Sequence, residues 1–444
     1  MRFKKLTNMQ IIALGFFILV LLGTGLLMLP FATAKGEQTS FLTALFTSVS
    51  ATCVTGLVTV DTATHWTLFG QLVIIALIQI GGLGFITVAT VFLSFARKNL
   101  GLKNRSLMAE SISASSIAGL RPLTKRILKW TLIFEGSGAV LLLYPFIRRF
   151  GAAKGIYYAV FHAVSAFCNA GFDLMGAEEP FSSFESFADD ILVNTVFCLL
   201  IAIGGIGFAV WEDVRIHRLR LKHYSLHSKI VLCVSLILTF GGAILFYLFE
   251  AKGLFAGLPV WKGALRSVFQ SVTCRTAGFN TISLSELSLP SVLLSCFLML
   301  IGGSTGSTAG GIKTTTIAVT FLFLFSGLRA RKRVTLFGRT IDESAVKKAS
   351  GVICFNLSLI FIAAVLITAV QRLQLSDVLF ETFSAMGTVG MTTGITRELT
   401  SVSQAAVMFL MFCGRVGSVT LASAFLERRA EAQVRYPTEE IRIG

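Results

Sequence analysis

Long apolar runs alternate with polar segments along the whole chain. Four runs carry no charged residue, and each reaches the ~20 residues that a helix needs to cross a bilayer. They are residues 10–29, 67–96, 230–249 and 349–370. Four further runs carry at most two charges, and these are residues 127–147, 191–211, 287–328 and 399–426. The pattern predicts eight long hydrophobic helices in an all-α, polytopic membrane fold.

A shorter amphipathic segment lies between the two helices of each successive pair. The four segments are residues 44–57, 159–172, 267–279 and 379–391. In each, a phenylalanine precedes a glycine by 9 or 10 residues, and these glycines (Gly56, Gly171, Gly278, Gly390) recur at intervals of 115, 107 and 112. Such tandem similarity indicates a repeat architecture. We therefore divide the chain into repeats 1–96, 97–211, 212–328 and 329–426, followed by a tail of residues 427–444.

A glycine motif recurs inside the second long helix of each repeat. It reads IGGLG at 80–84, IGGIG at 203–207, IGGSTG at 301–306 and CGRVG at 413–417. Small residues at this spacing let helices approach closely in lipid, which is the plain interpretation of most of these glycines. The third copy differs by continuing into GGSTGSTAGGIK, and the fourth differs by carrying Arg415 in place of a glycine.

Four copies of helix, short helix, glycine-bearing segment and helix predict a pseudo-fourfold ring around a central pore. Irregular backbone at membrane depth is tolerated only where protein buries it or water reaches it. Glycine permits the dihedral angles that aim carbonyl groups at an axis, and rings of carbonyls replace the hydration shell of a monovalent cation. The negative ends of the four short helices would favour a cation further.

Composition and charge agree with a membrane protein and exclude other classes. Hydrophobic residues make up 54% of the 444 positions, and charged residues make up 14%. The formal net charge of +16 gathers in every second connection, so by the positive-inside rule both termini lie in the cytoplasm. We therefore expect no nucleic-acid partner. The acidic residues 176–190 are interpreted as a solvated outer loop.

Enzyme chemistry has no visible motif, so we expect no catalytic residue. The eight cysteines show no C-x-x-C pairing and read as small buried thiols. Gly306 and Gly311 have the spacing of a phosphate-binding loop, but Ile312 separates the second glycine from Lys313. We therefore expect no nucleotide bound by this chain. Arg275 and Glu135 are interpreted as paired structural charges.

The residues around the four glycines resemble a known family. The fourth repeat has Thr388-Val389-Gly390-Met391, close to the T-V-G-Y filter of potassium channels, and the third has Thr276-Ala277-Gly278-Phe279. With SATCVTGLVTVDTAT, QIGGLGF, AFCNAGFD, GGSTGSTAGGIK, GRVGS and the terminal RYP, the whole chain is similar to the Ktr/Trk/HKT superfamily of potassium transporters. Within it, the chain resembles most the KtrB-type membrane subunits of bacterial Ktr systems.

The resemblance implies a potassium filter built from backbone carbonyls. Gly56 keeps the potassium-type pattern, whereas some sodium-preferring plant relatives have serine there. Potassium is therefore the expected cargo, while permeation of sodium and activation by sodium stay open. A plain alternative is that the four glycines only cap four short helices. The implied filter residues are Val54, Thr55, Gly56, Asn169, Ala170, Gly171, Thr276, Ala277, Gly278, Thr388, Val389 and Gly390.

The resemblance also implies a gate below the filter. Each glycine costs a helix about 1 kcal/mol relative to alanine, so this glycine-rich run is expected to form a mobile loop across the pore. The expected gate residues are Gly302, Gly303, Ser304, Thr305, Gly306, Ser307, Thr308, Ala309, Gly310, Gly311 and Arg415. Arg415 would donate hydrogen bonds to loop carbonyls, since a charge at mid-membrane must face protein or water. Bonding to helix-end carbonyls away from the pore is the alternative.

The resemblance further implies partners and a location. It implies a homodimer in the bacterial cell membrane and a cytosolic ring of nucleotide-binding regulatory subunits of the KtrA or KtrC type. The basic loops at 97–129, 215–229 and 329–348 are candidate docking surfaces, and anionic membrane lipid is an equally physical partner for them. The rival hypothesis is a coupled secondary cation symporter, although such folds usually show two repeats, often inverted.

Overall fold

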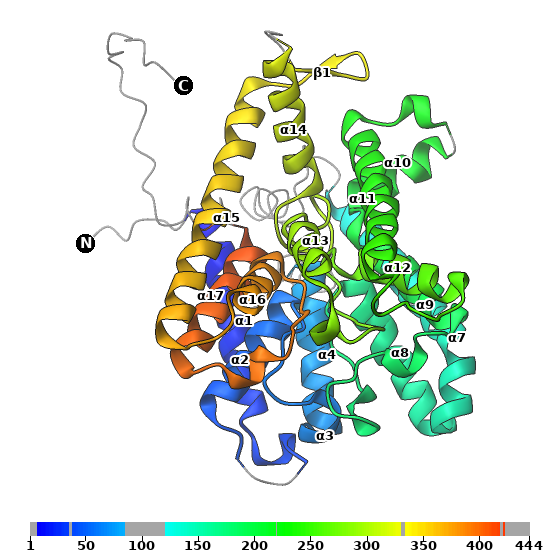
Figure 1. Ribbon diagram of the computed structural model, residues 1–444, viewed down its shortest axis with the longest axis vertical. Coiled ribbons are helices and arrows are strands. Elements are labelled where there is room, and N and C mark those ends of the chain that lie inside the picture. Colours follow the sequence, from blue (N-terminus) through cyan, green and yellow to red (C-terminus); the bar gives the residue numbers. More distant parts are fainter. Residues whose placement is uncertain are drawn as a thin grey trace.

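The structure is a computed structural model, and it describes residues 7–34, 38–84, 120–218, 220–329, 334–417 and 421. Within this part the protein is built almost entirely of helices, which Figure 1 shows side by side. The first helix of each repeat is long and apolar: α1 (Asn8–Leu27), α7 (Leu120–Phe150), α11 (Leu226–Glu250) and α15 (Glu343–Val370). Each of these four is long and apolar enough to cross a membrane by itself.

The short helix of each repeat follows, and it ends three to five residues before the glycine found in the sequence. These helices are α2 (Phe41–Cys53), α8 (Ala152–Cys168), α12 (Val260–Thr273) and α16 (Leu375–Gly387). Ser40 caps the first of them by accepting a hydrogen bond from the Thr43 amide. An irregular segment then leads to the second helix of the repeat. Those second helices are α4 (Leu68–Leu83), α9 (Ile191–Gly205), α13 (Leu289–Leu300) and α17 (Ser401–Val416).

The second helices of the second and third repeats are interrupted at their glycine motifs. This corrects the expected uninterrupted helix at 191–211, whereas a break at the glycine-rich run was expected within 287–328. After α9 the chain bends by 95° and continues as α10 (Phe208–His217). After α13 it leaves the helix for thirteen residues and resumes as α14 (Thr314–Leu328). Gly207 has a φ of 92°, in the region that glycine tolerates and other residues avoid, so the helix cannot run on through it. The expected ends of 67–96 and 399–426 lie outside the described residues.

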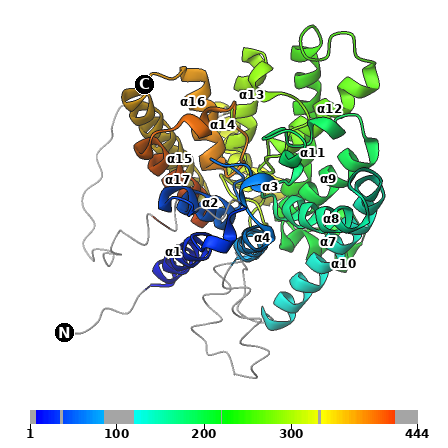
Figure 2. The same cartoon turned by 90° about the horizontal axis from the view of Figure 1, so that it is seen from below.

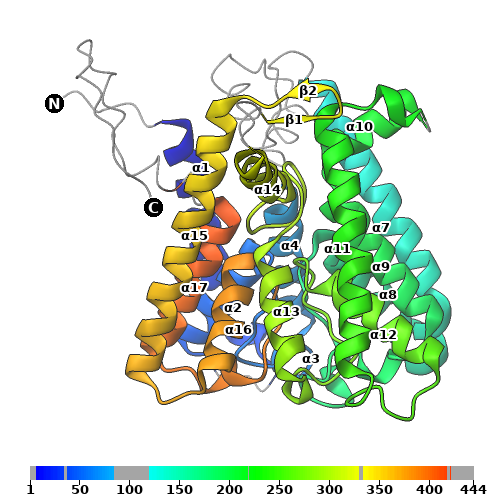
Figure 3. The ribbon, with the colours of Figure 1, turned by 45° about the horizontal axis from the view of Figure 1, so that its top comes forward.

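Small elements complete the fold. The turn α3 (Thr62–His65) follows the first glycine, and 3-10 turns lie at Pro30–Ala32, Met175–Ala177, Glu185–Phe187, Leu221–His223, Leu284–Glu286 and Ile395–Glu398. The strands β1 (Thr335–Leu336) and β2 (Arg339–Thr340) form an antiparallel hairpin before α15. Figure 3 shows this hairpin and α10 at one end of the molecule and α3 at the other.

The four repeats contact one another in chain order and close on themselves. The second helix of each repeat packs on the short helix of the next one: α4 on α8, α9 on α12, α13 on α16, and α17 back on α2. Figure 2 shows the repeats arranged around a centre in this order. These contacts form a closed ring, and the pseudo-fourfold symmetry of the repeats stays a prediction.

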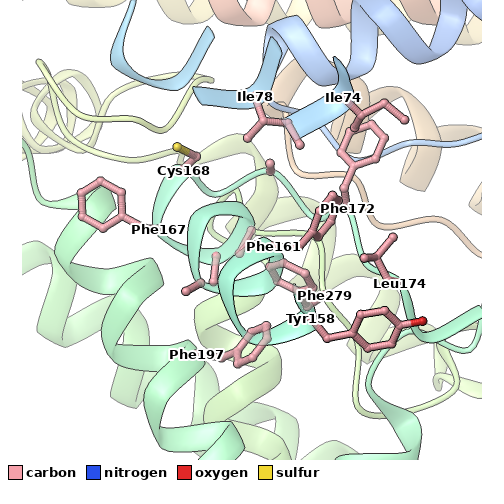
Figure 4. Close-up of a cluster of buried hydrophobic side chains, with 14 of the residues drawn as sticks. Ile74, Ile78, Tyr158, Phe161, Phe167, Cys168, Phe172, Leu174, Phe197 and Phe279 are labelled. Atoms are coloured by element: carbon pink, nitrogen blue, oxygen red, sulfur yellow. The ribbon is translucent and has the colours of Figure 1, made fainter. Parts of the chain in front are cut away.

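Aromatic side chains fill the space between neighbouring repeats. Figure 4 shows Phe161 of α8 and Phe197 of α9 beside Phe172 and Phe279, which follow the second and third glycines. The Phe197 and Phe279 rings meet edge to face with centroids 5.0 Å apart. All four phenylalanines are buried. This packing joins α8 and α9 to the irregular segments that follow the second and third glycines.

Candidate functional site: a ring of four glycine segments

The glycine segments are residues 54–56, 169–171, 276–278 and 388–390, and all four share one unusual backbone conformation. The first residue of each has a positive φ: 57° at Val54, 61° at Asn169, 79° at Thr276 and 51° at Thr388. A positive φ is rare outside glycine, and for β-branched Val and Thr it is a strained conformation. Its recurrence at equivalent positions indicates that the surrounding fold imposes it.

The third residue of each segment is the glycine, and its φ is positive in every case. The values are 99°, 69°, 84° and 94° at Gly56, Gly171, Gly278 and Gly390. A methyl group on Gly56 would come within 2.6 Å of the Ala170 carbonyl oxygen, and one on Gly171 within 2.8 Å of the Ala277 carbonyl oxygen. Each glycine therefore lies so close to the next segment that no side chain would fit between the two.

The remaining two contacts close the ring. A methyl group on Gly278 would overlap the Val389 carbonyl oxygen, and one on Gly390 would overlap the carbonyl oxygen of Thr55, in the first repeat. The glycine of each repeat thus meets the carbonyl that precedes the glycine of the next repeat. The twelve predicted filter residues come together in this ring, although the first and the last of them lie more than 300 residues apart in the chain.

Hydroxyl groups of the short helices hold the segments in place. The Ser50 hydroxyl accepts a hydrogen bond from the Gly56 amide, and the Ser384 hydroxyl accepts one from the Gly390 amide, both at 3.1 Å. In the second repeat the Ser165 hydroxyl donates to the Phe172 carbonyl at 2.7 Å. Thr273 does the same for Phe279 at 2.6 Å. The third repeat is one residue shorter here, which explains why Thr273 takes this place.

The backbone carbonyls of the segments stay free of protein donors. Within the described part of the chain, no hydrogen bond reaches the carbonyl oxygens of Val54, Thr55, Asn169, Ala170, Thr276, Ala277, Thr388 or Val389. Buried carbonyls are almost always paired, so eight free ones in one ring need an explanation. A ring of unpaired carbonyl oxygens is the chemistry that coordinates a desolvated cation.

A cavity of about 290 Å³ opens at one side of the ring. The four glycines line it together with acidic side chains, among them Asp61, Asp173, Glu179 and Glu185, and one arginine, Arg397. We call it the mouth cavity. Burial raises the pKa of Asp173 to about 7, and the charge of Asp61 adds to the rise. The prediction of a merely solvated acidic loop at 176–190 omitted this cavity, to which Glu179 and Glu185 belong.

The predicted gate residues 302–311 form a loop pinched at its base. The Gly302 amide donates to the Ile312 carbonyl at 2.8 Å, and the Ser304 and Thr314 hydroxyls hydrogen bond at 3.0 Å. The loop then docks on the break between α9 and α10, where the Ser304 amide donates to the Gly205 carbonyl at 2.9 Å.

Two contacts bring this loop close to the glycine segments. The Thr308 hydroxyl donates to the Phe167 carbonyl, just before the second segment, at 3.1 Å. A methyl group on Gly310 would lie 2.9 Å from the Thr388 Cγ2 in the fourth segment. Four residues of the loop carry hydroxyls, namely Ser304, Thr305, Ser307 and Thr308. Only that of Ser307 bonds within the described loop, to the Ser304 carbonyl at 2.7 Å, because Thr314, Thr315 and Phe167 supply partners outside it.

Arg415 lies at the end of α17 and connects three repeats. Its guanidinium donates to the carbonyl of Thr308 in the loop, and also to the carbonyls of Gly81 and Gly82 at the end of α4. The expected hydrogen bond to a loop carbonyl is therefore present, together with bonds to the carbonyls at the end of α4.

Lys313 also holds the loop, although no role was predicted for it. Its ammonium donates to the Ala309 carbonyl at 2.6 Å and to the Gly310 carbonyl at 3.2 Å. The available signal was a basic side chain two residues after the last glycine of the run. Two basic side chains, Arg415 and Lys313, therefore donate to loop carbonyls.

The expectation that Arg275 and Glu135 are paired charges is wrong. Arg275 donates to the Ser235 carbonyl and to the Thr239 hydroxyl, and Glu135 accepts from the Gln79 amide at 3.3 Å. No ion pair to either residue is found in the described part of the chain. Helix-surface carbonyls and neutral side chains serve instead, as they do for charges inside membranes.

Comparisons with known proteins identify the family. A family model described as TrkH, cation transport protein, matches residues 4–433. The chain is 41% identical to the potassium/sodium uptake protein NtpJ of Enterococcus hirae, covering 99% of this chain and 98% of that protein. It is 37% identical to the Ktr system potassium uptake protein B of Bacillus subtilis, covering 100% of this chain and 98% of that protein.

A solved structure has the same fold. The crystal structure of the potassium transporter TrkH from Vibrio parahaemolyticus superposes with a TM-score of 0.76. At 18% identity it covers 96% of this chain and 86% of that one. The ring of glycine segments, the apolar helices and the match along nearly the whole sequence lead to one conclusion: the protein is a multi-pass membrane protein that belongs to the TrkH family of cation transport proteins.

Proposed function

We propose that this protein carries potassium ions across the bacterial plasma membrane through the ring of glycine segments. The observation that carries the proposal is the closed ring in which eight carbonyl oxygens accept no hydrogen bond from the described residues. Such oxygens can replace the water around a K⁺ ion. Relatives named for potassium uptake support K⁺ as the cargo.

The carbonyls of the residues at the first and second positions of each segment would coordinate the ion. The glycine at the third position keeps the segments close enough for carbonyls of four repeats to act together. The C-terminal ends of α2, α8, α12 and α16 precede these segments. Their helix dipoles add a favourable potential for a cation. No resident cofactor is part of the proposal, because the protein oxygens and the cargo suffice.

The loop at 302–311 and Arg415 would form the gate. The hydrogen bonds from Arg415 and Lys313 to loop carbonyls support this role, since they fix the loop in one position. A positive charge beside the ion path also opposes the passage of a cation. Opening would then require these contacts to break or to move together with the loop.

Orientation and partners complete the proposal. The mouth cavity faces outward, and both termini and the hairpin of β1 and β2 face the cytoplasm, as the distribution of basic residues favours. The protein would act as a homodimer with a cytosolic ring of nucleotide-binding regulatory subunits. Relatives named as components of Ktr systems support such an association. The basic segments 215–229 and 329–348 would contact that ring or anionic lipid.

Ion flux into liposomes that contain the purified protein tests this function. We expect K⁺ and Rb⁺ to enter down their own gradients faster than Na⁺, without any gradient of a second ion. Empty liposomes and liposomes with heat-denatured protein are the controls. Uptake that occurs only with an imposed Na⁺ or proton gradient would instead identify a coupled symporter, and equal entry of K⁺ and Na⁺ would contradict the filter.

A further inference from the structure

One position in the short helices carries a different polar residue in each repeat. It directly follows the phenylalanine that precedes the glycine by 9 or 10 residues, and its occupants are Thr47, His162, Gln270 and Glu381. All four are at most 1% exposed. A buried polar group is unfavourable unless it is hydrogen bonded, so four of them at equivalent positions invite the question of what they bond.

In the first and third repeats the bonds stay within the helix. The Thr47 hydroxyl donates to the Thr43 carbonyl at 2.9 Å, and the Gln270 amide donates to the Cys274 sulfur at 3.6 Å. The Gln270 Oε1 has no hydrogen-bond partner among the described residues. These two side chains hold nothing beyond their own helices through the bonds found among the described residues.

In the second and fourth repeats the bonds reach the segment that follows the glycine. His162 Nε2 accepts a hydrogen bond from the Leu174 amide at 3.0 Å, while Nδ1 lies 2.6 Å from the Tyr158 carbonyl and donates to it. Glu381 Oε1 accepts from the Thr396 hydroxyl at 2.6 Å. Leu174 and Thr396 lie three and six residues after their glycines, close in sequence to residues that line the mouth cavity. We call these two hydrogen bonds braces, because each holds a segment that forms part of the cavity wall.

The two braces belong to opposite repeats, because the repeats close in chain order. The segments that they hold line the mouth cavity with Phe172 and Asp173 on one side and with Met391, Thr392 and Thr393 on the other. The distance between these walls determines the width of the ring's entrance. A brace on each side therefore controls the width of this entrance, and that width determines which ion size fits.

Glu381 shares with Gln270 a buried oxygen without a hydrogen-bond partner among the described residues. Its second carboxyl oxygen, Oε2, is buried and has no hydrogen-bond partner among the described residues. An unsatisfied buried oxygen destabilises a fold, and a shorter or apolar side chain at this position would avoid it. What distinguishes Glu381 from Gln270 is its hydrogen bond to Thr396, which lies outside its own helix.

We propose that Glu381 is a positioning residue for ion selectivity, acting through Thr396 on the segment that follows Gly390. The inference rests on the proposed function, because selectivity needs an ion path. Loss of the Glu381–Thr396 bond would let the fourth wall of the mouth cavity relax away from the ring. The entrance would then fit the dehydrated K⁺ ion less well, and Na⁺ would compete better.

Four variants test the role by the ratio of K⁺ to Na⁺ flux in liposomes. Glu381→Leu and Thr396→Val each remove the bond, and we expect either to lower the ratio by about 10-fold, the scale of losing one hydrogen bond to a charged group. Glu381→Gln and Thr396→Ser keep an acceptor and a donor, and we expect ratios near that of the wild type. Combining Glu381→Leu with Thr396→Val should add little, because the two residues act as one unit.

A matched control is available on the same helix. Thr382 is equally buried, and its hydroxyl donates to the Val378 carbonyl of its own helix at 2.9 Å. Thr382→Val therefore removes a buried hydroxyl without touching the brace, and we expect lower thermal stability with an unchanged flux ratio. A similar drop of the ratio in Thr382→Val would overturn the specific role of Glu381.

The outcomes separate this inference from the proposed function. A wild-type protein that does not prefer K⁺ contradicts the proposed function and the inference together. A selective wild type whose ratio survives Thr396→Val contradicts the inference alone. Should Glu381→Leu fail to fold, Thr396→Val and the two conservative variants still decide the question.

Discussion

At the residue scale, the glycine segments depend on conformations that most side chains resist. Val54, Thr276 and Thr388 are β-branched residues at positive φ, which costs on the order of 1–3 kcal/mol each. Such strain persists only where the surroundings over-determine it, and the hydrogen bonds that Ser50 and Ser384 accept from the glycine amides belong to those surroundings. The positive φ recurs in all four repeats, and the second repeat meets it with Asn169, a residue that tolerates it better.

Asp173 gives a prediction about pH. Its pKa of about 7 means that the carboxyl is mainly neutral below that pH and mainly ionised above it. Ionisation adds a negative charge at the mouth cavity, which raises the local concentration of K⁺. We expect the initial rate of uptake from low external K⁺ to rise as the outer pH increases through about 7.

The Asp173→Asn variant should lose this rise and keep the low-pH rate throughout. Glu286→Gln is the control, because Glu286 is exposed and lies outside the residues that line the mouth cavity. An Asp173→Asn protein whose uptake still increases with pH as in the wild type would show that another group is responsible. Glu185, whose pKa burial also raises, would be examined next.

At the element scale, the sequence predicted which helices exist better than where they stop. The first helices agree with the apolar runs, and the short helices agree with the amphipathic segments. Both signals are local, because the length of an apolar run and the period of its hydrophobic residues can be read from neighbouring positions. The bend after Gly205 was not predicted. From the sequence, IGGLG and IGGIG were interpreted as close-packing motifs. The structure shows instead that the helix ends after Gly205 and that the third repeat contacts this end, where the Ser304 amide donates to the Gly205 carbonyl.

The loop at 302–311 gives a prediction about conduction. Deleting Ser304 to Ala309 removes the contacts with Phe167 and Gly205 and the carbonyl that Arg415 holds, while the glycine segments stay intact. We expect faster K⁺ flux into liposomes and an unchanged preference for K⁺ over Na⁺. A folded deletion variant that conducts more slowly than the wild type would mean that the loop is not an obstacle.

Arg415 gives a related prediction. Arg415→Ala removes the bond to Thr308, and charge-assisted hydrogen bonds contribute about 1.5 to 3 kcal/mol each. The balance between closed and open states should shift by roughly 10-fold to 100-fold, with a matching gain in flux. Combining this change with the loop deletion should add little, and fully additive gains would mean that the charge acts directly on the ion.

Arg415→Lys is the informative companion variant. It keeps the positive charge but cannot donate to Thr308 and to Gly81 and Gly82 in the same fork geometry. A gate based on hydrogen bonds predicts flux close to that of Arg415→Ala, and a gate based on charge predicts flux close to that of the wild type. If Arg415→Ala only reduces the amount of folded protein, its role is structural.

At the scale of the whole molecule, the closed order of the repeats was predictable and its contacts were not. Four glycines at regular intervals imply four equivalent units. Such units can bury their equivalent surfaces together when they pack around one centre, which makes a ring. The sequence did not indicate that each glycine would meet the carbonyl before the next glycine. That contact joins Gly390 to Thr55 across more than 300 residues, and no local pattern encodes it.

Ion pairs between repeats should contribute little to the stability of the assembled ring. Asp189 before α9 pairs with Lys262 and Arg266 of α12, both at 2.8 Å, and these partners hold the pKa of Asp189 below its usual range. The pairing is present above the ordinary pKa of an aspartate and is lost as the pH falls through the lowered one. Because the carboxylate is partly exposed, Asp189→Asn should cost only about 0.2–1 kcal/mol.

Thermal unfolding in detergent checks this prediction. The melting temperatures of Asp189→Asn and the wild type should differ by a few degrees at low salt and converge at high salt, since salt screens exposed charges. A large, salt-independent loss would mean that the ion pairs are a main connection between the second and third repeats.

Serine substitution of the ring glycines tests the central claim, that the four glycine segments together form the ion-selective path. Gly56→Ser, Gly171→Ser, Gly278→Ser and Gly390→Ser each force a side chain against the carbonyl of the next repeat, and Gly25→Ser is the control because nothing lies within 4 Å of its added atom. The measurement is the ratio of K⁺ to Na⁺ flux for each folded variant in liposomes. The account predicts a lower ratio in the ring variants and an unchanged ratio in the control. Ring variants that fold and all keep the wild-type ratio would contradict it.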